Sequence, residues 1–380
     1  MELQKTNYHA GQGWTSPLPS GLDGSGTLVL AFGANQYGDD ARPLDELAAA
    51  FPGSVVVGCS TAGEIDGAQF DDGSVSAVIC RFEHSRMSLA QTDVAGPEDS
   101  GAAGARLAAQ LPAEGLRAVF VLSDGLCVNG TPLVAGLSSA LPVGVPITGG
   151  LAGDGSRFVG TWVFAAGQAR PKQICAIGFY GERLRVGHGC DGGWSDFGPA
   201  RRITRSEGNV LHELDGRPAL DLYKEYLGKL AAGLPGTALL FPLSIRRPGD
   251  KSTPLVRTVL GVDEATRSMT FAGDVPQGHE ARLMRTTDDG LIASAANAIA
   301  QATEHFTSGQ PLLVISVSCV GRRLVLGERT EEEVEAVVDG APQGSAHVGF
   351  YSYGEISPRA DGGASGLHNQ TMTVTVLCEA

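Results

Sequence analysis

The sequence lacks the short motifs that identify the commonest metal and hydrolase sites. No Cys-x-x-Cys pair occurs, which excludes zinc-ribbon spacing and the Cys-x-x-Cys-His motif of covalent haem attachment. The motifs His-Glu-x-x-His and Gly-x-Ser-x-Gly are absent as well. No catalytic constellation is recognisable, and we predict that the protein is not an enzyme.

Positive charge and long apolar runs are also scarce. The chain holds 28 Lys and Arg against 42 Asp and Glu, a formal net charge of −14, so nucleic acid and anionic membranes are unfavourable partners. No run approaches the ~18 apolar residues of a membrane span, and the first residues lack the basic start and apolar core of a secretory signal. The cysteines, seven in number, are expected to be reduced. We expect a cytoplasmic protein.

What the sequence does contain is a threefold repeat. The segment SVVVGCSTAGEI from Ser54 returns as AHVGFYSYGEI from Ala346 and, in degraded form, as VPITGGLAGD from Val145. Each copy is a buried-looking run that ends in small residues and a Gly-acid pair, which is typical of a strand entering a tight turn. Because an apolar run precedes each copy and an alternating run follows it, we infer duplicated supersecondary units.

Each unit is predicted to run strand, helix, strand, turn, strand. Leucines at helical spacing lie between the first two runs, Leu44 and Leu47 in the first unit and Leu133 and Leu137 in the second. A connecting helix favours parallel pairing of its two strands, and the last, alternating strand can return antiparallel. The predicted fold class is α/β, with two domains whose mixed sheets are built from these repeated units.

A segment of different composition, 183–230, separates the second unit from the third. It is rich in Gly, Arg, Asp and aromatic residues, whereas the repeats are aliphatic. We predict an N-terminal arm over 1–26, a domain of two units over 27–182, a bridge over 183–230 and a second domain over 231–380. In the second domain, Asp288 and Asp289 are expected to cap a helix.

Several segments resemble the FIST family of bacterial sensory proteins. They are GCSTAGEI, GPARRITRSEGNVLHELDGRPALDLYKEYLG, FAGDVPQGHE, and GFYSYGEISP followed by LHNQTMTV, spread from about Thr27 to Leu377. By this resemblance the first predicted domain is a FIST N domain and the second a FIST C domain. The resemblance implies a ligand-binding module in signal transduction. No effector segment is recognisable, so the signal is expected to pass to a separate protein by contact.

A subset of similar stand-alone proteins implies a more specific function, haem-based sensing of nitric oxide with a histidine kinase as partner. Haem needs an apolar slot, an axial ligand and cations near its propionates. His188, in the Gly-rich loop predicted for GHGCDGGW, is the first candidate for the iron ligand, with Cys190, Trp194 and Arg205 nearby in sequence. His368 is the second. The alternatives are a loop histidine that bonds a backbone carbonyl and, for His368, a residue that orders a turn.

An amino acid or another small metabolite is the rival ligand. Arg205, Asn209 and Asp215 form a polar set in the predicted bridge, and an arginine is suited to grip a carboxylate. An internal Arg-Asp pair that holds the bridge is the structural alternative for this set.

The Gly-acid turns are candidates for the same ligand. Glu64 and Glu355, with Tyr353 beside the third turn, would line a pocket where turns converge. The structural alternative is that the carboxylates accept hydrogen bonds from the N–H groups of the turn and so fix its shape.

An enzyme that uses Cys59 or Cys190 as a nucleophile is the rival outside the class of binding proteins. Cys59 is followed by Ser60 at the end of a predicted strand, but no His and acid lie at a recognisable spacing from it. Ligand binding without catalysis is therefore the preferred interpretation.

Overall fold

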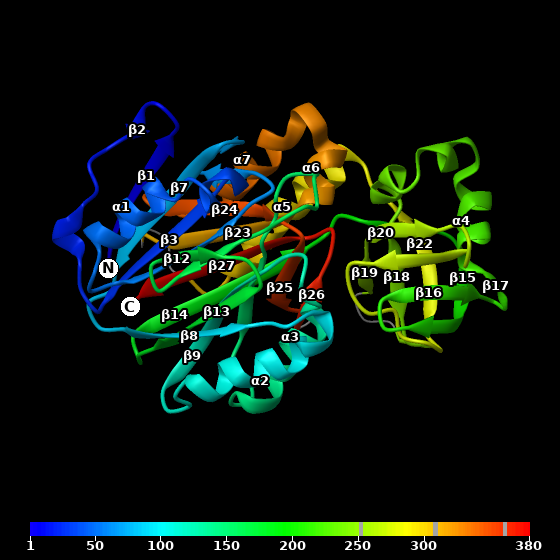
Figure 1. Ribbon diagram of the computed structural model, residues 1–380, viewed down its shortest axis with the longest axis horizontal. Coiled ribbons are helices and arrows are strands. Elements are labelled where there is room, and N and C mark those ends of the chain that lie inside the picture. The colour runs from blue at the N-terminus through cyan, green and yellow to red at the C-terminus, as the bar shows by residue number, and fades with distance from the viewer. Residues whose placement is uncertain (251–253, 307–310, 360–362) are drawn as a thin grey trace.

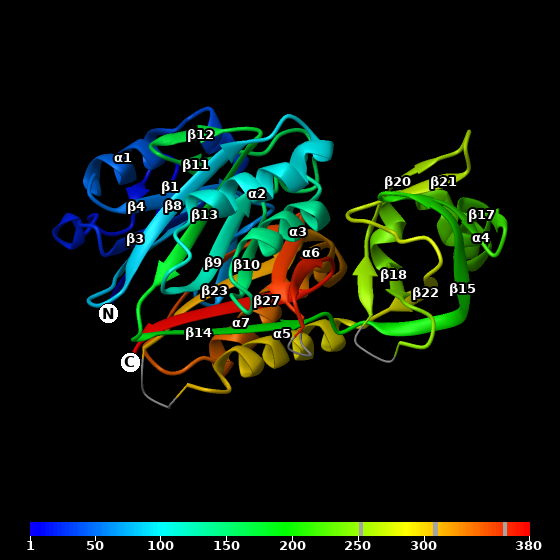
Figure 2. The same ribbon diagram turned by 90° about the horizontal axis from the view of Figure 1, so that it is seen from below.

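Three sheets of the same internal layout enclose the centre of the molecule, and a separate lobe projects from one end (Figures 1 and 2). The computed structural model describes residues 1–250, 254–306, 311–359 and 363–380. Within these residues, no helix is long and apolar enough to cross a membrane.

Each sheet is organised around one repeat unit. The first strand of the unit lies parallel to the second and antiparallel to the last. This arrangement confirms the predicted mixed sheets and the crossover helix between the parallel strands. The units are β3 (Thr27–Gly33), α1 (Arg42–Ala50), β4 (Val55–Ser60) and β7 (Ser74–Arg81); β9 (Leu116–Ser123), α3 (Gly130–Ala140), β10 (Ile147–Leu151) and β13 (Gln173–Tyr180); and β23 (Leu313–Cys319), α6 (Val320–Leu326), α7 (Thr330–Gly340), β24 (Ala346–Ser352) and β27 (Met372–Glu379).

A hairpin follows the second strand of each unit and adds to the sheet of a different unit. The hairpin of the first unit pairs with β24, that of the second with β4, and that of the third with β10. The three sheets are thereby interlocked in a cycle. The hairpins are β5 (Glu64–Asp66) with β6 (Gln69–Asp71), β11 (Val163–Ala165) with β12 (Gln168–Arg170), and β25 (Gly354–Pro358) with β26 (Ser365–His368).

The opposite edge of each sheet is also formed in the same way, by a strand that precedes the unit in the chain. β1 (Glu2–His9) pairs with β7, β8 (Arg86–Asp93) with β13, and β14 (Leu184–Asp191) with β27, all antiparallel. A short strand, β2 (Gly13–Trp14), extends the first sheet beyond β1. The residues of the predicted N-terminal arm thus lie partly in a sheet.

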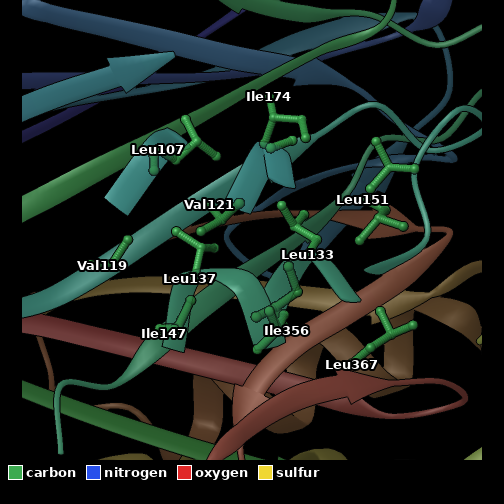
Figure 3. Close-up of a cluster of buried hydrophobic side chains, with 14 of the residues drawn as sticks. Leu107, Val119, Val121, Leu133, Leu137, Ile147, Leu151, Ile174, Ile356 and Leu367 are labelled. Atoms are coloured by element: carbon green, nitrogen blue, oxygen red, sulfur yellow. The ribbon is translucent and has the colours of Figure 1, made fainter. Parts of the chain in front are cut away.

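The strands are buried on both faces, which explains their nearly continuous apolar sequences. The inward faces of all three sheets share one core, in which the rings of Phe32 and Phe350 lie 4.8 Å apart between centroids. Helices cover the outward faces. Figure 3 shows Leu107 of α2 (Ser100–Gln110) and Leu137 of α3 packed with Val121 and other residues of the second sheet. α1 covers the first sheet, while α7 and α5 (Asp288–Thr303) cover the third.

One glycine recurs in the second strand of every unit because two backbones approach closely there. A Cβ atom on Gly58, Gly149 or Gly349 would lie 2.0–2.1 Å from a carbonyl oxygen of the parallel first strand. That separation is far below van der Waals contact, so only glycine fits without a shift of the sheet. The repeated glycine is thus a packing requirement of the parallel pair.

The lobe is inserted between β14 and α5. Its first and last strands pair with each other, with Ser195 opposite Arg285. In the second unit the corresponding connection, from β8 to α2, takes only residues 94–99. The lobe consists of β15 (Ser195–Glu207), β16 (Val210–Leu214), β17 (Arg217–Pro218), α4 (Ala219–Leu227), β18 (Leu243–Arg246), β19 (Leu255–Arg257), β20 (Val259–Asp263), β21 (Ser268–Phe271) and β22 (Glu280–Arg285) around a core of its own.

The residues of the predicted bridge, 183–230, divide between the two parts of the molecule. β14 belongs to the third sheet, whereas β15 to α4 belong to the lobe. The predicted cap of α5 is wrong in detail: the side chain of Thr287 accepts a hydrogen bond from the Gly290 N–H at 3.1 Å, and the two aspartates lie in the first turn. There they still favour the helix dipole.

The close approach of the parallel strands yields a stability prediction. Gly58→Ala should lower the free energy of unfolding by roughly 1–3 kcal/mol, because the added methyl group must displace the backbone of β3. Gly366→Ala in β26 is the matched control, since its Cβ would meet no atom within 4 Å. Urea unfolding measures both variants. Equal stabilities of the two would show that the strands are not in close contact.

Candidate functional site

β14 presents alternate residues to two different environments. Gly187 and Gly189 face α5, where a Cβ on either would lie 1.9 Å from a helix carbonyl oxygen. His188 and Cys190 point to the opposite face, as the twofold periodicity of a strand requires. The Gly-rich loop predicted for this segment is wrong, because the first two glycines serve close helix packing rather than a turn.

His188 lies in a cleft of about 940 Å³, here called the aliphatic cleft. Its ring is half-buried and has no hydrogen-bond partner among the described residues. Burial lowers the pKa of His188, so the imidazole is neutral at neutral pH. The apolar lining consists of Leu116, Leu141, Pro142, Val143, Val145, Pro146, Ile147, Leu184, Val186, Pro358 and Ala364.

Two arginines complete the aliphatic cleft. Arg117 and Arg185 line it, both are exposed, and neither forms an ion pair within the described residues. A neutral imidazole, an aliphatic wall and guanidinium groups are the chemical types that haem requires. The residues present therefore fit that cofactor. The described residues contain no group of three or more His, Cys, Asp or Glu side chains that could hold a metal ion alone.

Cys190, Trp194 and His368 lie together in a second cleft, of about 270 Å³, here called the hinge cleft. It opens at the junction between the lobe and the rest of the molecule, here called the body. β14 and the β26–β27 turn of the body lie on one side, and β19 and Met284 of the lobe lie on the other. The ring of His368 is oriented by a 3.0 Å contact between Nε2 and the carbonyl oxygen of Ser357, and burial lowers its pKa to about 4. Hence four of the sequence-predicted cofactor residues fall into two clefts, with His188 separate from Cys190, Trp194 and His368, while Arg205 lines neither cleft.

The Gly-acid turns are held by their own carboxylates. Glu64 accepts hydrogen bonds from the N–H groups of Gly73 and Ser74, each at 3.0 Å. Glu355 accepts from the hydroxyl of Ser352 at 2.7 Å and from that of Thr371 at 2.9 Å. Both side chains therefore have the turn-fixing contacts of the structural alternative.

Asp154 fixes the second turn in the same manner. It accepts hydrogen bonds from the N–H groups of Phe158, Val159 and Gly160 and from the hydroxyl of Tyr353. Burial raises the pKa of Asp154, but these hydrogen bonds outweigh it, and the pKa lies below its usual value. The hydroxyl of Tyr353 is thereby committed to a neighbouring turn.

Two of these turns border a third cleft, of about 550 Å³, lined by Glu64 and Asp154. Arg323 lies over the ring of Phe70, with 4.8 Å from its guanidinium carbon to the centroid, and is ion-paired with Asp72. The charges in this cleft are thus largely neutralised within the protein.

Arg205, Asn209 and Asp215 belong to the lobe and line neither the aliphatic cleft nor the hinge cleft. Arg205 is paired with Glu213 at 3.0 Å and Asp215 with Arg201 at 3.1 Å. The amide of Asn209 donates to the carbonyl oxygen of Phe271 at 2.8 Å. An internal pair of the predicted kind exists, although the arginine is Arg201.

Two protein-family profiles match this chain. The profile of the FIST N domain matches residues 27–217, and that of the FIST C domain matches residues 219–358. The chain belongs to the FIST family. FIST domains are associated with the sensing of small ligands in signal transduction. The junction of the two matches falls inside the lobe, just before α4.

The chain is similar to proteins of a bacterium and of an archaeon. The uncharacterized protein Rv0628c of Mycobacterium tuberculosis is 26% identical over 279 residues, which are 68% of each chain. The uncharacterized protein MJ1623 of Methanocaldococcus jannaschii is 24% identical over 325 residues, 78% of this chain and 58% of its own length. Neither name indicates an activity.

The cysteines proposed as nucleophiles are poorly suited to that role. Cys59 lies in the central core, where burial raises its thiol pKa well above the ordinary value. Burial raises the pKa of Cys190 to about 12. Because the thiolate is the reactive species, neither side chain is activated.

Sequence reasoning missed Arg117 and Arg185, which line the aliphatic cleft, and Asn369, which lines the hinge cleft. The arginines lie on β9 and β14, strands far apart in sequence that meet only in the folded FIST body. Asn369 was overlooked although it directly follows His368 in the quoted LHNQT segment. The side chain of Asn369 is only 1% exposed, and nothing in the sequence around it predicts that burial.

The buried carboxyl of Glu355 yields a prediction on pH. Burial raises its pKa to about 8 from an ordinary value of 4.5, so the folded protein holds a proton that the unfolded chain releases. This contribution to stability is complete below pH 4.5 and falls by up to about 1.4 kcal/mol per pH unit until the pH passes about 8. Glu355→Gln should therefore be more stable than the wild type at pH 9 but not at pH 4.5.

Urea unfolding across that pH range measures the effect. Glu225→Gln, an exposed position on α4, is the control and should keep the wild-type profile. A Glu355→Gln profile parallel to that of the wild type would contradict the prediction.

Proposed function

We propose that this FIST protein is a haem-based sensor in which His188 supplies the axial ligand. The observation that supports the proposal is the half-buried, neutral and unpartnered imidazole of His188 in the aliphatic cleft. Bound haem supplies an iron that takes up a diatomic gas. The protein supplies the ligand, an apolar enclosure and two cations.

The aliphatic cleft supports haem better than the rival ligand. Its volume, about 940 Å³, lies at the upper end of the range of about 300–1,000 Å³ for small-molecule sites. Arg117 and Arg185 have no ion-pair partner among the described residues and are available for propionates. By contrast, Arg205 and the acidic turns, suggested for an amino acid, are occupied by internal contacts.

Nitric oxide as the gas and a histidine kinase as the partner complete the proposal. The FIST assignment favours a signalling role. Val143 lines the aliphatic cleft and is fully exposed, so a protein that packs against this side chain would touch the edge of the cleft. A separate signalling protein that contacts this edge would sense the cleft.

Haem titration tests the axial ligand. Haem added to the purified protein should give a sharp Soret band that moves when nitric oxide is added to the reduced form. His188→Ala should lose the band or weaken haem affinity at least tenfold, because no other nitrogen ligand lines this cleft within the described residues.

His368→Ala is the matched control, since His368 lies in the hinge cleft and is comparably enclosed. It should keep the wild-type spectrum. An unchanged spectrum in His188→Ala, or loss of the band in His368→Ala alone, would refute His188 as the ligand.

A further inference from the structure

The hinge cleft is closed by two different parts of the chain. Trp194, His368 and Asn369 come from the body, and Leu255 and Met284 come from the lobe. An occupant of the cleft would therefore touch both parts. This geometry is independent of His188 and of haem.

Asn369 is the residue that points to an occupant. It is 1% exposed, and neither its amide nitrogen nor its amide oxygen has a hydrogen-bond partner among the residues that the structure describes. Buried polar atoms are normally paired, because an unpaired one loses its hydration without compensation. Gln370, the next residue, has a φ of 60°, a left-handed conformation that non-glycine residues seldom adopt. Such strain is characteristic of functional sites.

The other walls define the chemistry of the occupant. The indole of Trp194 is fixed by a 2.9 Å hydrogen bond from Nε1 to the carbonyl oxygen of Gln370. In the tautomer in which His368 Nε2 donates to Ser357, its Nδ1 is left as an acceptor. Leu255 and Met284 add an apolar side. The lining is thus aromatic, amide and aliphatic.

Charge contributes little to the hinge cleft. Two ionisable rim residues, Asp191 and Arg359, already have partners; Asp191 accepts hydrogen bonds from Gly193 at 3.2 Å and from Asn297 at 3.0 Å. The unpaired group in the lining is instead the neutral amide of Asn369, which an uncharged ligand can satisfy. The cleft favours an uncharged molecule.

We propose that the hinge cleft binds a small, uncharged, planar ring compound whose edge carries a carbonyl oxygen beside an N–H group, as in a lactam. The amide of Asn369 matches that edge with one donor and one acceptor, and the indole of Trp194 offers the ring a flat face. The volume of about 270 Å³ restricts the ligand to one or two fused rings. Occupancy joins the lobe to the body.

Titration calorimetry of the haem-free protein with uracil and with hypoxanthine tests the proposal. At least one of them should bind saturably and change the intrinsic fluorescence, because Trp194 lines the cleft. Dimethyluracil, methylated at both ring nitrogens, has the same ring without N–H donors and should bind at least tenfold more weakly. Absence of binding by both probes, or equal binding of the methylated ring, would overturn the proposal.

Asn369→Leu separates a ligand-binding role from a structural one. Leucine has a similar volume and removes the unpaired polar atoms, so the ligand-free variant should melt at the same or a higher temperature while probe affinity falls at least tenfold. Asn209→Leu is the control, because that amide is hydrogen-bonded and should lower the melting temperature without loss of binding.

Two further variants complete the test. Leu255→Trp fills the cleft from the lobe side and should abolish probe binding, which keeps the proposal testable if Asn369→Leu does not fold. His188→Ala should bind the probe as the wild type does, so failure of the haem assignment leaves this result unaffected. Full probe affinity in Asn369→Leu or in Leu255→Trp would refute the site.

Discussion

The cyclic exchange of hairpins between the three sheets is the constraint on which the body of this protein depends. Each hairpin leaves its own unit through a Gly-acid turn and completes the sheet of another unit. A single unit would have an incomplete sheet edge and an uncovered apolar face. The hairpin of the second unit therefore completes the sheet of the first unit, and the hairpin of the first unit completes the sheet of the third.

The turns can direct the hairpins only because their acids are satisfied inside the fold. Glu64 and Glu355 accept hydrogen bonds from residues of their own units. Asp154 accepts them from the N–H groups of its own turn and from Tyr353 of the third unit. The acid is therefore retained in the repeat as a structural device, which accounts for its recurrence. None of these three acids lines the aliphatic cleft or the hinge cleft, the two clefts proposed for ligands.

Much of the body followed from sequence periodicity. The apolar runs, the crossover helices and the alternating last strands predicted the mixed sheets, since these features depend on residues close in sequence. The exchange of hairpins could not be predicted, because β5 and β24 are separated by more than half of the chain. The lobe was also hidden, because β15 and β22, which pair at its base with Ser195 opposite Arg285, lie far apart in the sequence.

The candidate site was predicted only in part, for a comparable reason. The alternation Gly-His-Gly-Cys was visible, but nothing in it indicated that the glycines pack against α5. Proximity in sequence grouped His188 with Trp194 and Arg205, although a strand advances about 3.3 Å per residue and carries such neighbours into different surroundings. Arg117 was missed because only folding brings β9 to this edge of the cleft.

The pairing of Ser195 with Arg285 closes the lobe at its base. Because the two ends of the lobe leave the body side by side, the lobe takes the place of a short connection and interrupts the body at one point only. Evolution can therefore lengthen, trim or exchange this module without disturbing the interlocked sheets. The cleft at its base would then change its chemical preference with the module, while the cleft around His188, formed wholly by the body, would keep its own.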